Sequence, residues 1–344
     1  MDNLRLVGIG ASAGGVEALF ELVAGLETGL DAALLVVVHQ ASGGPSVLAD
    51  LLARRTAVPV ATARHGAPLV PGAVLVAPPD AHLHVSDGHV VLTHGPKENG
   101  HRPGIDPLFR SLSFAAGPAA TGVVLSGLLD DGASGLLDIV RHGGTAVVQD
   151  ADEAHYDAMP NAALEQVPGA VVRRARDIGA VLAEITSRPL LEANRPSNRL
   201  TYEVRVSRGA EREMLEHDPP GRPVGISCPD CSGPLFDLGG ADNPRFRCRV
   251  GHAWSPRSLG YAQDDAVERA LYAALRALED KVALSHRIAA SADATGAVRV
   301  AEKSRRSARE GLHSATLLRR LLVAGGRSVG PADGGSDDAD GSVR

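Results

Sequence analysis

The stretch VGIGASAGG, residues 7–15, decides the fold class, because a glycine-rich turn there joins a short apolar run to a helical pattern. Residues 4–9 read as a strand, and residues 14–26 space their apolar side chains along one face of a helix. Two kinds of chemistry use a strand, a turn and a helix in this order. The turn can cradle a pyrophosphate at the helix start, or it can present a serine nucleophile, here Ser12.

The same alternation continues through the first half of the chain. Apolar runs that read as strands alternate with helical patterns up to about residue 188. Strands that are apolar throughout and alternate with helices predict an α/β fold with a doubly wound, mainly parallel sheet and helices on both faces. Residues 71–95 differ, and they predict a β-hairpin on the periphery of the sheet with its turn at Asp87 and Gly88.

The composition narrows the class of protein. Of the 344 residues, 44% are hydrophobic and only 3% are aromatic, so the core must be built from Ala, Val, Leu and Ile. The formal net charge of -6 argues against a general nucleic-acid binder. The apolar runs are too short to span a bilayer, and the first residues do not resemble a secretory signal. We therefore expect a cytoplasmic protein without membrane insertion.

The pattern predicts five parts along the chain. Residues 1–188 form the α/β domain, and the polar residues 189–222 read as a linker. Residues 223–256 hold all three cysteines and read as a small metal-binding knuckle. Residues 257–325 predict a helical segment, and residues 326–344 predict a disordered tail because they are rich in Gly, Asp and Ser.

The glycine-rich stretch fits two motifs. Gly8 to Ala13 matches the dinucleotide pattern G-x-G-x-x-G/A, which also needs an acidic residue at the end of the second strand to hold a ribose hydroxyl. The second strand instead ends in His39 and Gln40, which disfavours a dinucleotide. The same stretch matches G-x-S-x-G, with Ser12 at its centre.

Three expected strand ends bring reactive side chains to one edge of the sheet. Ser12, His39 and the pair Asp130–Asp131 each follow a strand, and ligands bind at the carboxyl edge of such sheets. A histidine can take the serine proton, and an aspartate can orient the histidine. Taken alone, the serine is more simply a helix N-cap, the histidine a structural residue and the aspartates a turn. Their joint placement favours a Ser-His-Asp site.

The α/β part resembles the catalytic domain of the chemotaxis protein-glutamate methylesterases, the CheB-type family. The resemblance covers residues 4–188 and is carried, in order, by IGASAGGVEAL, VVVHQ, PGAVLVAPPDAHL, GIDPLFRSL, LSGLLDDGASGL and VVQDADEAHYDAMPNAAL. It implies that Ser12 is the nucleophile, His39 the base and Asp131 the residue that orients the base. Asp130 is then a neighbour without that role.

The resemblance also implies an activity. Backbone N–H groups at Ala13 and Leu128 would stabilise the oxyanion during hydrolysis of glutamate methyl esters, and glutamine would be deamidated by the same route. The implied substrate is a methylated chemoreceptor or a similar signalling protein, so we expect a shallow, exposed site and no catalytic cofactor. Chemotaxis members carry a receiver domain before the esterase. Only three residues precede the first expected strand here, so we expect no receiver domain and no control by phosphorylation in cis.

This chain departs from the family pattern in two places. The family commonly has threonine where this chain has Ala13, and Met-Gly where it has Leu128 and Leu129. The loss of that glycine raises the question of whether the aspartate loop keeps its shape. These departures keep an alternative open, a non-catalytic regulatory or scaffold protein in a chemotaxis-like pathway. The intact serine, histidine and aspartate favour the enzyme.

The cysteine segment predicts a metal site. Cys228 and Cys231 are separated by two residues, and Cys248 and His252 by three. A two-residue spacer lets two thiolates face one cation, and the second pair closes a tetrahedron. Four protein ligands leave no position for a substrate, so we expect structural zinc. The alternatives are free thiols and a nucleic-acid-binding knuckle, and the acidity of the chain weakens the second.

The apolar pattern of the first expected C-terminal helix does not specify what this helix packs against. Its apolar residues lie near heptad spacing over only about three heptads, which is short for a coiled coil. We expect this helix to pack on a neighbouring element. The alternative is a homodimer or a docking surface for a partner.

Overall fold

The computed structural model describes residues 4–40, 47–190, 194–209, 220–240 and 243–325. The chain divides into two compact units, residues 1–262 and residues 263–344. The tail predicted over 326–344 lies outside the described residues. Within the described ranges, no helix combines the length and the apolar character needed to cross a membrane.

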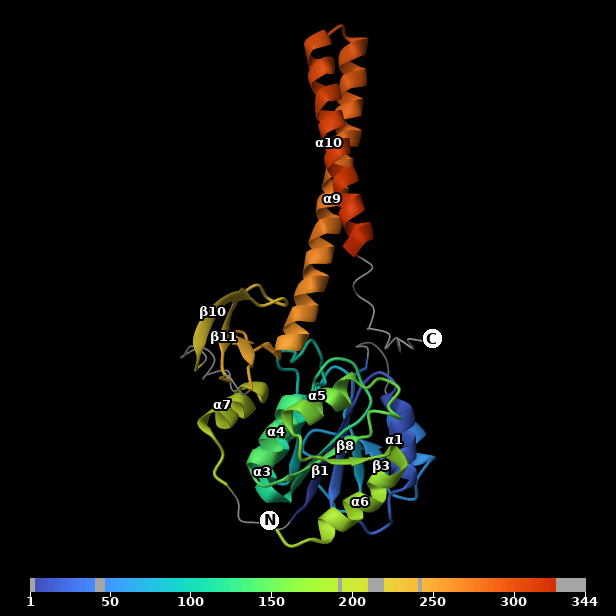
Figure 1. The fold of residues 1–344 in the computed structure, drawn as a ribbon, viewed down its shortest axis with the longest axis vertical. Helices are drawn as coiled ribbons and strands as arrows, with labels where there is room; N and C mark the ends of the chain where they lie inside the picture. Colours follow the sequence, from blue (N-terminus) through green and yellow to red (C-terminus); the bar gives the residue numbers. More distant parts are fainter. Residues whose placement is uncertain (1–3, 41–46, 191–193, 210–219, 241–242, 326–344) are drawn as a thin grey trace, which may run out of the picture. The chain divides into compact units, whose positions relative to one another are not determined.

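A seven-stranded parallel sheet forms the centre of the first unit (Figure 1). Its order is β3-β4-β2-β1-β7-β8-β9, and each strand pairs in parallel with its neighbours. The strands are β1 (Leu6–Ala11), β2 (Ala33–Val38), β3 (Val60–Thr62), β4 (Val74–Val76), β7 (Ala120–Val124), β8 (Thr145–Gln149) and β9 (Val171–Arg173).

Helices cover both faces of this sheet, which confirms the predicted doubly wound class. One apolar core joins the sheet to α1 (Gly15–Ala24), α2 (Leu48–Ala53) and α6 (Ala175–Ser187). A second core joins it to α3 (Ile105–Ala116), α4 (Ala133–Arg141) and α5 (Ala158–Gln166). Figure 1 shows the two sets of helices on opposite sides of the strands. A short 3-10 helix, η1 (Gly117–Ala119), leads from α3 into β7.

The first two glycines of the opening stretch serve helix packing. A Cβ added at Gly8 would lie 2.5 Å from Leu112 Cδ1, and one added at Gly10 would lie 2.3 Å from Ile105 Cγ2. Both neighbours belong to α3. The glycines therefore let this helix approach the central strand more closely than any larger residue would allow.

The strand order reverses direction beside β1. This strand lies between β2, which follows it in the chain, and β7, which comes much later. The chain thus leaves β1 toward one edge of the sheet and later returns to its other side. In open α/β sheets, ligands bind outside the carboxyl ends of the strands at such a point. Ser12 and His39 directly follow β1 and β2 there.

The predicted hairpin exists, but it is shorter than expected. Strands β5 (His82–Ser86) and β6 (His89–Thr93) pair antiparallel around a turn in which Asp87 has φ 50° and Gly88 has φ 74°. The expectation that residues 71–95 all belong to this hairpin is wrong, because Val74–Val76 is β4 of the central sheet. A three-residue apolar run does not reveal which sheet it joins, and here parallel pairing with β2 and β3 decides it.

The linker predicted over 189–222 is wrong for its middle part. Residues Asn198–Ser207 form the helix α7, and the hydroxyl of Ser197 accepts a hydrogen bond from the Leu200 N–H as its N-cap. Leu200, Glu203 and Val204 are buried. A glutamate on the buried face hid the amphipathic pattern, because a charged residue there reads as part of a polar stretch.

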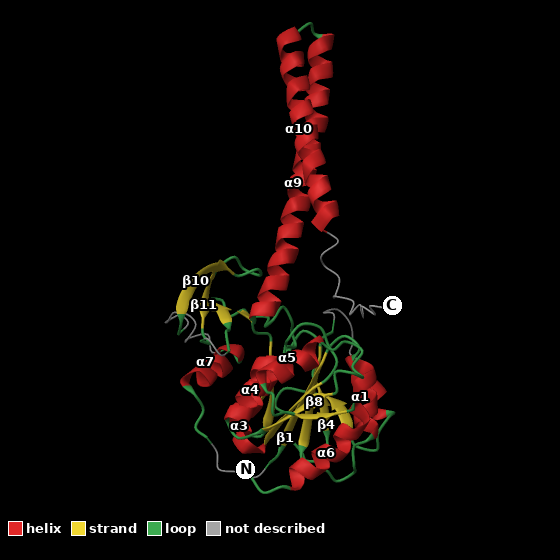
Figure 2. Cartoon of the chain, in the orientation of Figure 1, coloured by secondary structure: helices red, strands yellow, loops and turns green. Residues whose placement is uncertain are grey.

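The segment after α7 is a small antiparallel sheet. Its strands are β10 (Arg222–Ser227), β11 (Pro234–Asp237), β12 (Phe246–Cys248) and β13 (Ala253–Trp254), and we call the described residues from 220 to 255 the Cys/His module. A helix, α9 (Pro256–Ala294), follows. In the second unit, the part of α9 after residue 262 and α10 (Val298–Gly325) form a helical hairpin, drawn as two long helices in Figure 2.

Candidate active site

Ser12 sits in the sharp turn between β1 and α1. Its backbone N–H donates to the Ser126 carbonyl at 3.0 Å, and its carbonyl accepts from the Gly15 N–H at 3.0 Å. Gly14 takes φ 66° at the start of the helix. A Cβ on Gly127 would lie 2.8 Å from the Ser12 Cβ, so a glycine there leaves room for the serine. The turn therefore holds the Ser12 side chain at the carboxyl edge of the sheet.

His39 bridges the serine and an aspartate. Its Nδ1 lies 3.0 Å from Ser12 Oγ, and its Nε2 lies 2.8 Å from Asp131 Oδ2. A carboxylate can only accept, so Nε2 carries the proton toward Asp131. This tautomer leaves the lone pair of Nδ1 facing the serine hydroxyl. The imidazole is thus set to accept a proton from Ser12.

The carboxylate of Asp131 accepts four hydrogen bonds. Oδ2 accepts from His39 and from the Ile105 N–H at 2.7 Å, and Oδ1 accepts from Asn99 Nδ2 at 2.8 Å and from the Asp106 N–H at 3.2 Å. Burial acts to raise the pKa of Asp131, but the hydrogen bond and charge of His39 outweigh it, and the net pKa is well below the usual range. The carboxylate is therefore ionised beside the imidazole at neutral pH.

A second histidine stacks on the first. The rings of His39 and His101 are 3.6 Å apart between centroids and within 7° of parallel. Burial, followed by the charge of His39, lowers the pKa of His101 to about 4, so this ring is neutral at pH 7. His101 covers one face of the His39 imidazole and limits its rotation.

Asp130 makes a different contact from its neighbour. Its Oδ1 accepts a hydrogen bond from the Ser255 hydroxyl at 2.6 Å, and burial raises its pKa to about 6. Asp131 alone of the two aspartates reaches His39. This assignment agrees with the role that the resemblance implies for each.

The two backbone groups expected at an oxyanion site belong to Ala13, which follows Ser12, and to Leu128, which follows Gly127. In the described part of the chain, the N–H groups of Ala13 and Leu128 have no protein acceptor. Leu129 has φ 61°, a left-handed conformation that favours glycine. Leu129 thus takes a left-handed conformation in the aspartate loop although it is not a glycine.

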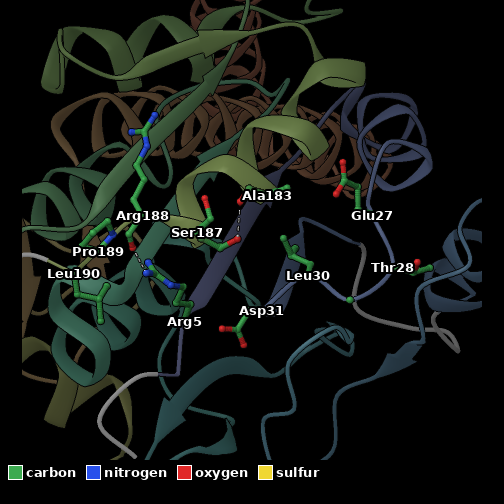
Figure 3. A pocket seen from close by; sticks show the side chains of 12 residues that line it. Arg5, Glu27, Thr28, Leu30, Asp31, Ala183, Ser187, Arg188, Pro189 and Leu190 are labelled. Carbon is green, nitrogen blue, oxygen red and sulfur yellow. Dashed lines mark hydrogen bonds between the residues drawn. The ribbon is translucent and has the colours of Figure 1, made fainter.

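A cavity elsewhere in the first unit is not this site. A hollow of about 610 Å³ is lined by Arg5, Asp31 and Ser187, among other residues (Figure 3). Arg5 precedes β1 and Asp31 precedes β2, so the hollow opens at the amino edge of the sheet. Ser12, His39 and Asp131 do not line it.

A serine, a histidine and an aspartate in one hydrogen-bonded chain, at the carboxyl edge of a doubly wound sheet, define a class of α/β protein with the side-chain arrangement of serine hydrolases. The family model described as CheB methylesterase matches residues 7–182. The chain belongs to the CheB methylesterase family, as its motifs predicted.

Individual relatives agree with this assignment. Protein-glutamate methylesterase/protein-glutamine glutaminase 3 of Anaeromyxobacter dehalogenans is 45% identical over 161 residues, which are 46% of this chain and 47% of that protein. The protein-glutamate methylesterase/protein-glutamine glutaminase of Azospirillum brasilense is 32% identical over 188 residues, or 53% of this chain and 48% of that protein. The chain spans about half the length of the curated relatives it matches.

A solved structure shares the fold. The CheB methylesterase catalytic domain of Thermotoga maritima matches with a TM-score of 0.51 and 28% sequence identity. The match covers 53% of this chain and 98% of that domain. The remaining part of this chain, which contains the Cys/His module, lies beyond the family match at residue 182.

The four predicted metal ligands lie together in the Cys/His module. The ligand atoms of Cys228, Cys231, Cys248 and His252 are all within 4.8 Å of one another. Cys248 Sγ lies 3.6 Å from Cys231 Sγ and 3.6 Å from His252 Nδ1. A tetrahedral ion with metal–sulfur bonds of about 2.3 Å needs sulfurs about 3.8 Å apart. The donor set and its spacing therefore fit one four-coordinate metal ion.

Sequence reasoning missed three residues of the site. Asn99, His101 and Asp106 touch Asp131 or His39, but the first two lie in a loop without regular structure and the third in the first turn of α3. The clue available in the sequence was ENGHRPGID, residues 98–106, which places an amide, an imidazole and a carboxylate between glycine and proline turns.

Proposed function

We propose that this chain is a serine hydrolase that removes methyl groups from glutamate methyl esters of a chemoreceptor-like protein. The observation that carries the proposal is the continuous contact from Ser12 Oγ through His39 to Asp131, at 3.0 Å and 2.8 Å. Membership of the CheB methylesterase family and the names of the relatives support the same substrate class.

The mechanism is acyl transfer. Ser12 Oγ attacks the ester carbonyl while His39 Nδ1 takes its proton, and the Nε2–H donated to Asp131 keeps the imidazole in place. The N–H groups of Ala13 and Leu128 stabilise the oxyanion, and one such donor typically contributes about 3 kcal/mol to the lowering of the barrier. His39 then protonates the departing methanol. Water, deprotonated by His39, hydrolyses the acyl-enzyme and regenerates Ser12.

The same residues support deamidation of glutamine. The amide carbon is attacked by Ser12 in the same way, and His39 protonates the leaving ammonia instead of methanol. The names of the relatives include protein-glutamine glutaminase, which supports this second reaction. The substrate side chain belongs to another protein, and it would reach Ser12, which is half-buried at the carboxyl edge of the sheet. We propose that both reactions take place in the cytoplasm.

The metal site has a structural role in this proposal. Cys228, Cys231, Cys248 and His252 hold zinc, which links the two turns of the Cys/His module and supplies no step of the reaction. Asp230 Oδ2 lies 3.8 Å from His252 Nε2, on the ring nitrogen that faces away from the thiolates.

Labelling with a fluorophosphonate probe tests the nucleophile directly. The probe should modify Ser12 and no other serine, as read by peptide mass spectrometry. His39→Ala should slow labelling by at least about a thousandfold, because the hydroxyl then lacks its base. Ser113→Ala is the control, since the Ser113 hydroxyl is buried and bonds to the Asp138 carbonyl and to His142, away from Ser12, His39 and Asp131. Labelling of His39→Ala at the rate of the unmodified protein would refute the proposal.

A further inference from the structure

Two arginines of the Cys/His module are fully buried, although arginine is almost never buried without partners. Arg245 donates to three carboxylates outside the module, at 2.7 Å to Asp106, 2.6 Å to Glu98 and 2.7 Å to Glu203. Arg247 donates to Glu98 at 2.9 Å. Buried ion pairs therefore join the module to α3, to α7 and to the segment before α3.

One of these carboxylates touches the candidate active site. Asp106 Oδ2 accepts from Arg245 and from Asn99 Nδ2, the latter at 3.0 Å, while the Asp106 N–H donates to Asp131. Burial raises the pKa of Asp106, the charge of Arg245 opposes this rise, and the nearby Asp131 adds to it. Arg245 thus provides the positive charge that lets two carboxylates lie side by side in a buried place.

Asn99 is a second link between the module and Asp131. Its Oδ1 accepts from the Ser255 N–H at 2.8 Å and from the Ser258 hydroxyl at 2.9 Å. Its Nδ2 donates to Asp131 at 2.8 Å as well as to Asp106. The backbone N–H of Ser255 can only donate, so it fixes the oxygen of the amide and turns the amide nitrogen toward the carboxylates.

The backbone around Asn99 is also held by the module. The Asn99 N–H donates to the Ala253 carbonyl at 2.7 Å, and the Ala253 N–H donates to the Lys97 carbonyl at 3.3 Å. A Cβ on Gly100 would lie 3.8 Å from the Trp254 ring. The next residue is His101, which stacks on His39. One short loop therefore contacts both the base and its orienting aspartate, and strand β13 fixes that loop.

We propose that the Cys/His module is part of the catalytic site. Arg245 is a positioning residue that acts on Asp131 through Asp106 and Asn99, and the module fixes the loop that carries Asn99 and His101. This inference rests on the proposed function, because it takes Ser12, His39 and Asp131 as the reacting residues. It goes beyond that function in assigning a catalytic contribution to a segment outside the family match.

The rate of Ser12 labelling by a fluorophosphonate tests this inference in the full chain. Arg245→Met keeps the length of the side chain and removes its charge and its donors. We expect labelling to slow by about tenfold or more, the effect of losing one hydrogen bond to a charged group. Arg110→Met is the matched control, because Arg110 is equally buried and donates to Glu98 but makes no hydrogen bond to Asp106. Its labelling should slow by less than about threefold.

A double-mutant comparison separates positioning from general loosening of the fold. In the Asp131→Ala background, Arg245→Met should change the labelling rate by less than about twofold, since the residue it positions is gone. The same fold-change in both backgrounds would overturn the inference. So would equal losses for Arg245→Met and Arg110→Met at a temperature where circular dichroism shows both to be folded.

A milder pair keeps the test decisive if Arg245→Met does not fold. Ser258, in the first turn of α9, donates to Asn99 and accepts from the N–H of Ser255 in the module, so Ser258→Ala loosens the contact between them and should slow labelling by about threefold. Ser113→Ala removes a buried hydroxyl that bonds to Asp138 and His142, and it should leave the rate unchanged. Equal rates for these two variants would contradict the inference.

The outcomes also separate this inference from the proposed function. Labelling of Ser12 that depends on Arg245, together with no release of methanol from methylated receptor, would remove the substrate assignment and leave the inference standing. Methanol release with labelling indifferent to Arg245 and Ser258 would remove the inference alone. A chain whose Ser12 is never labelled would overturn both.

Discussion

His101 acts on the candidate active site by stacking its ring on the imidazole of His39. Its ring lies parallel to His39 and 3.6 Å away, and it is neutral at pH 7 because burial lowers its pKa to about 4. A neutral ring adds no charge repulsion to the imidazolium that forms when Ser12 is deprotonated. The contact therefore restricts the rotation of His39 without opposing its protonation.

We predict that His101→Ala slows Ser12 labelling by about tenfold, because a stacked ring pair contributes about 1 kcal/mol and the freed imidazole also gains rotational freedom. His101→Phe, which keeps a flat ring, should retain most of the rate. Labelling kinetics at pH 7 provide the measurement. If the alanine and phenylalanine variants react equally fast, stacking is not the function of this ring.

The residues that strand ends carry could be predicted from the sequence, and those in loops could not. Ser12 and His39 directly follow apolar runs, and Asp131 lies in a strand-to-helix turn, so the parallel sheet brings them to one edge. Asn99 and His101 reach the same place from a loop whose path depends on β13, more than 150 residues later in the chain. No local pattern encodes that contact.

At the scale of elements, α7 is held by charge as well as by apolar contact. Glu203 is fully buried among the guanidinium groups of Arg245, Arg247 and Arg199. Burial acts to raise its pKa, but the surrounding arginines, Arg110 first among them, outweigh burial and lower the pKa to about 2. Folding therefore favours the ionised form of this carboxyl.

This shift predicts a pH dependence of stability. The pKa of Glu203 falls on folding from 4.5 to about 2, so its contribution of about 3 kcal/mol is complete above pH 4.5 and is lost as the pH falls toward 2. The difference in unfolding free energy between the unmodified protein and Glu203→Gln should therefore shrink between pH 5 and pH 3. Urea unfolding at a series of pH values measures it.

The exposed Glu165 supplies the control for this titration. It pairs with Arg257 at the surface, where an ion pair contributes little, and Glu165→Gln should change the unfolding free energy by less than about 1 kcal/mol at every pH. A difference for Glu203→Gln that stays constant from pH 7 to pH 3 would show that its ionisation is not linked to folding.

We predict that the thermal stability of the protein depends on a metal ion bound in the Cys/His module. Cys228→Ser removes one of the four proposed ligands, so the purified protein should lose the proposed zinc and unfold at a lower temperature, since metal binding to such a site contributes directly to folding. Elemental analysis and thermal melting are the measurements. Ser227→Ala changes the exposed neighbouring residue and should keep both properties. Equal zinc content and equal melting temperatures in the two variants would contradict the assignment.

Some helices and strands could be predicted from the sequence pattern and others could not. Long apolar runs and helices with one apolar face were predicted correctly, because burial on one or both sides leaves a periodic signal. Strand β4 and helix α7 were not predicted correctly, and the reason differs between the two. The strand has only three residues, and the helix buries a glutamate whose partners lie on other segments.

At the scale of the whole molecule, the chain combines a family domain with parts that the family match does not include. Residues 7–182 match the CheB methylesterase family, whereas the Cys/His module and the helices α9 and α10 lie after it. The hydrogen bonds from Arg245 and Ser255 connect the module to the site within the first unit. Sequence patterns predicted these parts separately but not this connection.

Release of methanol measures the proposed hydrolysis of glutamate methyl esters by Ser12 directly. A chemoreceptor fragment carrying radiolabelled glutamate methyl esters is incubated with the full chain, and volatile label is counted over time. We predict release by the unmodified protein and release at least about a thousandfold slower by Ser12→Ala, with both proteins folded by circular dichroism. Release by Ser12→Ala at the unmodified rate, or no release by a protein whose Ser12 reacts with the probe, would contradict this prediction.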